Sequence, residues 1–197
     1  MELLTAVLRR CLCSFLCLPL VLCIDVSSGV VAGAESPAPT MHQVQAAFLF
    51  NFAKFVTWPD DAFQRSENSL IIGVLGEDPF GAVLEETIRD KTVMGKKLAV
   101  KRFVRIQDAA NSHILFLSSS EESRLPQIMK GLEQANVLTV SDMEEFAERV
   151  GMVAFTVEGQ KVRFNINVEA VERAGLKMGS QLLKLAKIVG DKSRTGN

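Results

Sequence analysis

Ala46-Ala-Phe-Leu-Phe-Asn51-Phe-Ala-Lys54-Phe-Val-Thr-Trp58-Pro59 is the densest aromatic run in the sequence and holds its single tryptophan. On a helix spanning residues 43–56, the apolar side chains of this run cover most of the circumference. That distribution predicts a helix buried by neighbouring elements on several sides. Pro59 ends the helix, because the residue before a proline is disfavoured in the α region.

One narrow stripe of this helix is less apolar than the rest. Gln43, Ala47, Asn51 and Lys54 recur at spacings of three and four and share one face. The stripe is either the solvated edge of a core helix or, together with Trp58, a surface that faces a pocket or a partner. Lys54 can lay its methylene groups along the aromatic rings. Asn51 is flanked by apolar residues, and we expect it to be a buried hydrogen-bonding group.

The beginning of the chain predicts export. Arg9 and Arg10 precede an apolar run over residues 11–24, which is too short to span a bilayer, and a more polar segment ends in Ala32-Gly33-Ala34. This pattern predicts a cleavable signal peptide over residues 1–34 and a periplasmic protein. The competing interpretation is a lipoprotein anchored at Cys23. Leu22 disfavours it, because a lipidation signal needs a small residue at that position.

The remaining chain is expected to be a leader over residues 35–42, one domain over residues 43–190, and a flexible tail over residues 191–197. Its charges are interspersed, and the whole chain has a net charge of −1. A nucleic-acid partner or an anionic membrane surface would require a basic patch, and none is present. No second apolar stretch is long enough to insert into a membrane. All four cysteines precede the predicted cleavage site, which excludes disulfides and thiolate chemistry downstream of it.

Strand and helix signals alternate along the predicted domain. The strands are expected at residues 69–75, 98–104, 113–117 and 136–140, and a hairpin at residues 152–157 and 161–166. Helices are expected at residues 79–88 and 121–132, after a capping box at Ser141 as far as residue 148, at residues 168–174 with Asn167 as the cap, and from Ser180 with an apolar face that reaches Val189. The pattern predicts an α/β fold: a three-layer sandwich with a mostly parallel central sheet and a C-terminal β-hairpin plus helices.

Catalytic and metal-binding motifs are absent from the sequence. There is no nucleophile elbow, no phosphate-binding loop and no pair of histidines at metal-ligand spacing. His42 is expected in the solvated leader, whereas His113 begins an apolar strand and is expected to be a hydrogen-bonded core residue. Gly73-Val-Leu-Gly76 is only a weak anion-binding signal. We therefore expect no enzymatic activity, no cofactor and no metal.

The stretch Arg163-Phe-Asn-Ile-Asn167 is the second candidate for a functional surface. Strand alternation places Phe164 and Ile166 in the core and Arg163, Asn165 and Asn167 on the opposite face. That face is either a solvated strand surface followed by a helix cap or a polar recognition surface.

Six segments of the chain together resemble the YfiR-like family. They are residues 46–59, Gly73-x-x-Gly-x-Asp-Pro-Phe-Gly81, Leu138-Thr-Val-Ser-Asp142 with Phe146, Gly151-Met152, Arg163-Phe-Asn-Ile-Asn167 and Ser180-Gln-Leu-Leu-Lys-Leu-Ala186. They occur in the family's order between Val44 and Val189. The resemblance implies a periplasmic α/β domain without enzymatic activity. Its better-known members repress a membrane-bound diguanylate cyclase by binding its periplasmic region, and so control cyclic-di-GMP, biofilm and motility.

The resemblance also implies what this chain lacks and what it binds. Some members carry cysteine pairs that make repression redox-dependent, and no cysteine follows the predicted cleavage site here. The expected partner is the periplasmic region of an inner-membrane signalling protein, either a diguanylate cyclase or a sensor kinase. Homodimerisation stays open.

The expected contact surface is the charged triplet Glu169, Arg173 and Lys177, together with Arg163 and Asn165. The alternative function is a small-ligand sensor domain that feeds a sensor kinase or a transporter. Its pocket would lie at the C-terminal edge of the sheet, where open α/β sheets bind ligands.

Overall fold

The aromatic helix α1 (Met41–Phe55) begins two residues before its predicted start, because Thr40 caps it. The Thr40 hydroxyl accepts a hydrogen bond from the Gln43 N–H, and the Gln43 side chain accepts one from the Thr40 N–H. The computed structural model describes residues 38–63 and 69–190. The predicted signal peptide, the rival lipid site at Cys23 and the predicted tail lie outside these residues.

The central sheet confirms the predicted mostly parallel arrangement. Its eight strands lie in the order β10-β8-β7-β6-β5-β2-β4-β3. Five neighbours, β4, β2, β5, β6 and β7, run parallel, whereas β8 is antiparallel to β7 and β3 is antiparallel to β4. The strand bounds are β2 Ser69–Leu75, β3 Thr92–Val93, β4 Lys96–Phe103, β5 Ile114–Leu117, β6 Leu138–Ser141, β7 Val153–Glu158, β8 Lys161–Asn167 and β10 Lys187–Val189.

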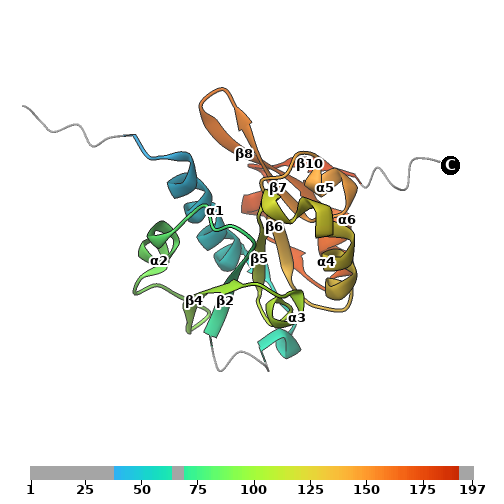
Figure 1. The fold of residues 1–197 in the computed structure, drawn as a ribbon. Helices are drawn as coiled ribbons and strands as arrows, with labels where there is room; N and C mark the ends of the chain where they lie inside the picture. Colours follow the sequence, from blue (N-terminus) through green and yellow to red (C-terminus); the bar gives the residue numbers. More distant parts are fainter. Residues whose placement is uncertain (1–37, 64–68, 191–197) are drawn as a thin grey trace, which may run out of the picture. The chain divides into compact units, whose positions relative to one another are not determined.

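Helices cover both faces of this sheet, as expected for a three-layer sandwich (Figure 1). The chain crosses from β2 to β4 through α2 (Ala82–Ile88) on the face that α1 covers. From β4 the chain returns past β2 to β5 through α3 (Ile106–Ala109). It then continues to β6 through α4 (Leu125–Leu132) and to β7 through α5 (Phe146–Arg149). These three helices lie on the other face. The direction of winding therefore reverses between β2 and β5. In open α/β sheets such a reversal is the usual position of a ligand crevice.

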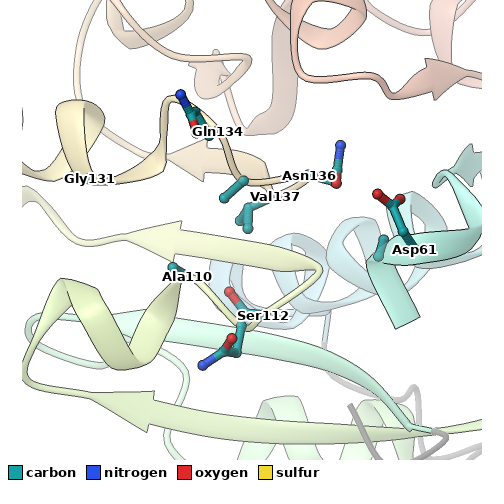
Figure 2. Close-up of a pocket in the computed structure, with 10 residues that line it drawn as sticks. Asp61, Ala110, Ser112, Gly131, Gln134, Asn136 and Val137 are labelled. Carbon is teal, nitrogen blue, oxygen red and sulfur yellow. The ribbon is translucent and has the colours of Figure 1, made fainter. Parts of the chain in front are cut away.

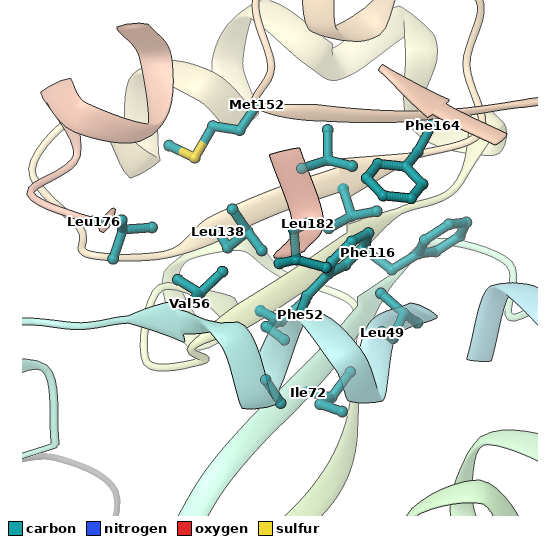
Figure 3. Close-up of a cluster of buried hydrophobic side chains, with 14 of the residues drawn as sticks. Leu49, Phe52, Val56, Ile72, Phe116, Leu138, Met152, Phe164, Leu176 and Leu182 are labelled. Atoms are coloured by element: carbon teal, nitrogen blue, oxygen red, sulfur yellow. The ribbon is translucent and has the colours of Figure 1, made fainter. Parts of the chain in front are cut away.

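The larger core lies between α1 and the sheet (Figure 3). Leu49 and Phe52 from α1 meet Ile72, Phe116 and Phe164 from the strands, and all five side chains are buried. A second cluster on the other face packs α4 and α5 against β5 and β7. The alternation predicted for β8 is confirmed, because Phe164 and Ile166 both enter the larger core.

Several helix predictions were wrong in extent. The helix predicted from Pro79 begins at Ala82, and the one predicted over residues 121–132 is a 3-10 turn, η2 (Ser119–Arg124), followed by α4. Ser141 ends β6 instead of opening a helix: its hydroxyl donates to the Leu117 carbonyl and accepts from the Met143 N–H, and α5 begins only at Phe146. The last helix, α7 (Ser180–Leu183), is one turn long, because the chain then forms β10 beside β8.

A two-stranded pairing joins the end of α1 to the C-terminal part of the domain. β1 (Val56–Thr57) runs antiparallel to β9 (Lys177–Met178), which follows α6 (Val168–Arg173). Asn167 caps α6 as predicted, since its side chain accepts a hydrogen bond from the Ala170 N–H at 3.0 Å. In the described part of the chain, no helix has the length and apolar character needed to cross a membrane.

Candidate functional site

The winding reversal between β2 and β5 is partly occupied by the protein's own groups. Gly76 follows β2 with a φ of 92°, and a Cβ placed on it would lie 2.5 Å from the Ser120 hydroxyl. The Glu77 N–H donates to the same hydroxyl at 3.0 Å. A backbone amide that could hold a ligand here is therefore already hydrogen-bonded within the protein. A shallow hollow of about 420 Å³ remains beside it, lined partly by Glu77, Glu121 and Arg124.

The positive charge of Arg102, beside the winding reversal, is also neutralised. Arg102, near the end of β4, donates to Asp78 at 2.7 Å, to the Gly81 carbonyl at 2.8 Å and to both oxygens of Glu85. The hydrogen bonds from Arg102 lower the pKa of the Glu85 carboxyl, and the two carboxylates raise the pKa of Arg102. The cluster holds α2 against β4, and its single positive charge faces two negative ones.

The predicted polar face of β8 is largely covered by α5. Asn165 is only 9% exposed and donates to Glu148 at 2.8 Å, and Asn167 donates to the Ala147 carbonyl at 3.0 Å. Neither a solvated strand face nor an open recognition surface describes these two residues. Their hydrogen bonds hold α5 against the sheet. Arg163 alone remains at the surface, 3.8 Å from Glu158 across the hairpin.

The charged triplet is divided between two elements. Glu169 and Arg173 lie one turn apart on α6, with their charged groups 3.9 Å apart, and both side chains are exposed. The helix ends at Arg173, and Gly175 has a φ of 73°, so Lys177 lies in β9 instead of continuing the helical face. Arg173 also borders a groove between α4 and α6.

The polar stripe of α1 and Trp58 lie in different environments. Lys54 is exposed, with its ammonium 5.1 Å from the centre of the Phe55 ring, and Asn51 is half-buried instead of fully buried as expected. Trp58 is 5% exposed, and its indole N–H donates to the His113 carbonyl at 3.2 Å. The stripe therefore lies at the surface of the helix, while the tryptophan belongs to the core.

His113 is the hydrogen-bonded core residue that the sequence predicts. Its Nδ1 accepts a hydrogen bond from the Ile71 N–H at 3.0 Å, which places the proton of the neutral ring on Nε2. The ring stacks on Phe63 at 4.6 Å and lies edge-on to Trp58. Burial, reinforced by the nearby ammonium of Lys96, lowers the pKa of His113 from 6.5 to about 4.

This pKa predicts a specific loss of stability in mild acid. Well above pH 6.5 the imidazole is neutral in both the folded and the unfolded chain and contributes no pH dependence. Between pH 6.5 and about 4 only the unfolded chain takes up the proton, so the free energy of unfolding falls as the pH is lowered. The full loss is about 3 kcal/mol, and it is complete below pH 4.

Urea unfolding between pH 7.5 and 4.5 measures this loss. His113→Asn should flatten that part of the profile, whereas the exposed His42→Gln should keep it. An NMR titration in which the His113 ring protonates near pH 6.5 would contradict the prediction.

A groove of about 620 Å³ lies between α4 and α6. Its lining includes Met129, Val137 and Met152, of which Val137 and Met152 are buried. Lys130 borders it from α4, Glu133 from the position directly after α4, and Arg173 from the end of α6. At one end the Asn136 amide donates to the Ala174 carbonyl at 2.9 Å and so ties the segment after α4 to the end of α6. The sequence did not predict this groove, because its two walls are about forty residues apart in the chain.

A more polar pocket of about 420 Å³ lies at the edge of the sheet opposite the winding reversal, beside the start of β5 and β6 (Figure 2). Its polar lining residues are Asp61, Asn111, Ser112, Gln134 and Asn136. The Ser112 hydroxyl is engaged with the Ala109 carbonyl at 2.6 Å. Across the residues that the structure describes, no group of three or more acidic, histidine or cysteine side chains could hold a metal ion.

Comparison with known proteins identifies one family. The sequence profile described as YfiR/HmsC-like matches residues 42–187. No protein with a curated functional description matches the chain significantly.

Among solved structures, a conserved domain protein from Vibrio cholerae is similar, with 13% identity and a TM-score of 0.50 over 76% of this chain and 60% of that one. An ABC domain in complex with L-Trp from Streptococcus pneumonia is 12% identical, with a TM-score of 0.49 over 66% of this chain and 58% of that one. The chain thus spans about three fifths of each solved chain. The likeness to the Vibrio cholerae protein bears on the fold alone.

Proposed function

Because the chain belongs to the YfiR/HmsC-like family, we propose that it is a periplasmic regulatory protein that represses a membrane-bound diguanylate cyclase by binding its periplasmic region. The family match over residues 42–187 carries this proposal. The protein acts by association, and it controls cyclic-di-GMP without turning over a substrate. The signal peptide predicted over residues 1–34 delivers it to the compartment where the cyclase exposes that region.

The arrangement of polar groups supports a binding role. At the winding reversal, where enzymes of this architecture commonly hold a cofactor, Ser120 accepts from the Glu77 N–H and Arg102 donates to the Gly81 carbonyl. His113, the one buried imidazole in the described residues, is hydrogen-bonded inside the core and neutral at physiological pH. Neither position offers the exposed, poised acid or base that general acid–base catalysis uses.

A small-ligand sensor is the second candidate function. The polar pocket of Figure 2 supports it, because Asp61, Asn111 and Gln134 supply one carboxylate and two amides around a space of about 420 Å³. That volume is within the range of small-molecule sites. The pocket lies at the start of the strands and not at the C-terminal edge expected from the sequence.

Gene deletion separates the two functions. Deleting the gene for this protein should raise cellular cyclic-di-GMP, and expressing the wild-type chain should restore the original level. Asp61→Asn leaves restoration intact if the polar pocket has no part in the regulation. Unchanged cyclic-di-GMP after deletion would overturn the proposed function and favour the sensor.

A further inference from the structure

The polar pocket of Figure 2 is built from three separate segments of the chain. Asp61 belongs to the 3-10 turn η1 (Asp60–Phe63), Asn111 and Ser112 to the connection between α3 and β5, and Gln134 and Asn136 to the connection between α4 and β6. One carboxylate, one hydroxyl and three amides therefore surround the same space of about 420 Å³.

Asp61 gives this pocket a negative charge. Among the described residues that line the pocket, it is the one charged side chain. Asp61 forms no salt bridge within the described part of the chain. The Lys96 ammonium lies 4.7 Å from the centre of the Phe63 ring and does not line the pocket. The Asp61 carboxylate is therefore available to a ligand of opposite charge.

Two further polar groups of the pocket have oriented hydrogen bonds and leave acceptors for a ligand. The Ser112 hydroxyl donates its only hydrogen to the Ala109 carbonyl at 2.6 Å, so it can only accept a further hydrogen bond. The Asn136 amide nitrogen donates to the Ala174 carbonyl at 2.9 Å, and its amide oxygen accepts no hydrogen bond from the described residues. Together with the Asp61 carboxylate, these oxygens suit a ligand that donates several hydrogen bonds.

The C-terminal end of α4 strengthens the preference for a cation. Gly131 lies in the last turn of this helix and Gln134 lies just beyond its end, and both line the pocket. The C-terminal end of a helix carries partial negative charge on its carbonyl groups and attracts cations. The helix and the Asp61 carboxylate therefore favour the same sign of charge in the ligand.

From this arrangement we propose that the pocket binds a small primary amine that carries no negative charge. An ammonium group supplies one positive charge and three hydrogen-bond donors, which match the Asp61 carboxylate and the neighbouring oxygens. The short body of the amine contacts the small apolar side chains of the lining, which are Ala62, Ala110, Ala135 and Val137. A divalent metal ion fits less well, because it requires several oxygen ligands and the pocket offers a single carboxylate.

This inference rests on the second candidate function, because it assigns a class of ligand to the pocket of the small-ligand sensor. Calorimetric titration of the predicted mature protein, residues 35–197, tests it with three probes that share one carbon skeleton: n-butylamine, n-butanol and butyrate. At neutral pH these probes are a cation, a neutral molecule and an anion. The protein should bind n-butylamine at least tenfold more tightly than n-butanol, and butyrate should not bind measurably. Equal affinity for n-butylamine and n-butanol would overturn the proposal.

Asp61→Asn tests whether the charge acts in this pocket, since it removes the charge and keeps nearly the same shape. It should weaken n-butylamine binding at least tenfold with an unchanged melting curve, because Asp61 is exposed and forms no salt bridge. The matched control is Asp60→Asn, at an exposed neighbour that does not line the pocket. It should change the affinity less than twofold at physiological salt, which screens exposed charges.

Equal weakening by Asp60→Asn and Asp61→Asn would overturn the pocket as the binding site, and so would wild-type affinity of Asp61→Asn. These titrations are independent of the cyclase. Unchanged cyclic-di-GMP after gene deletion would therefore overturn repression alone, whereas failure of n-butylamine to bind would overturn the amine site alone.

Discussion

Phe52→Ala is expected to lower the free energy of unfolding by about 3–5 kcal/mol, which is a large part of the stability of a domain of this size. Phe52 is 0% exposed. Its ring centre lies 5.3 Å from that of Phe164, 6.0 Å from that of Phe155 and 6.3 Å from that of Phe48. Truncation removes these contacts and leaves a cavity where α1 meets β7 and β8, and the rigid strands cannot collapse into it.

Phe50→Ala on the same helix is the matched control. Phe50 is half-buried, and the Lys91 ammonium lies 4.3 Å from its ring centre. Truncation of Phe50 should lower the free energy of unfolding clearly less than truncation of Phe52, because the Phe50 side chain buries less apolar surface on folding. Urea unfolding followed by circular dichroism measures both variants. Equal losses for Phe50→Ala and Phe52→Ala would show that the core of Figure 3 is not centred on α1.

Gly151→Ala is expected to destabilise the domain by about 3 kcal/mol, at the upper end of the range for overpacked sites. A Cβ on Gly151 would lie 2.0 Å from Cε1 of Phe146 and 2.3 Å from two further atoms of that ring. Phe146 cannot move aside freely, since it is 1% exposed and packed in the cluster beneath α4 and α5. The Gly151 N–H also donates to the Phe146 carbonyl at 2.7 Å, which fixes the two backbones together.

A double mutant identifies the ring as the cause. In a Phe146→Ala background, adding Gly151→Ala should cost less than 1 kcal/mol, because the obstructing ring is absent. Gly190→Ala serves as a control, since no atom lies within 4 Å of the Cβ it would gain. A Gly151→Ala variant as stable as the wild type would show that the close approach of Gly151 and Phe146 does not exist in solution.

The sequence was informative where local pattern and tertiary packing agree. The buried run at Ser69–Leu75 is a strand with the predicted bounds. The alternation around Phe164 and the cap at Asn167 were also predicted correctly, since each depends on a few neighbouring residues. At the C-terminus the local pattern and the tertiary packing disagree. Leu182, Leu185 and Val189 follow a helical period, yet β10 forms because β8 offers an unpaired edge, and Leu185 is left 61% exposed.

The surfaces were harder to predict than the fold. Alternation correctly placed Asn165 opposite the core, but it carries no information on whether a helix from elsewhere in the chain covers that side. The groove beside Arg173 depends on α4 and α6 meeting across the sheet edge, and neither helix has a local pattern that signals the other. Arg173 was selected from its spacing to Glu169, and that spacing carried no information on its place beside the groove that Lys130 also lines.

Reconstitution tests most directly whether the protein regulates by binding. The membrane cyclase whose own deletion abolishes the rise in cyclic-di-GMP caused by losing this protein is placed in lipid nanodiscs, which expose both of its faces. Residues 35–197 of this protein are then added in increasing amounts. The rate of cyclic-di-GMP synthesis should fall to a plateau, with half of the effect at the dissociation constant measured for the periplasmic region. A synthesis rate that stays constant at saturating protein would contradict the proposed regulation.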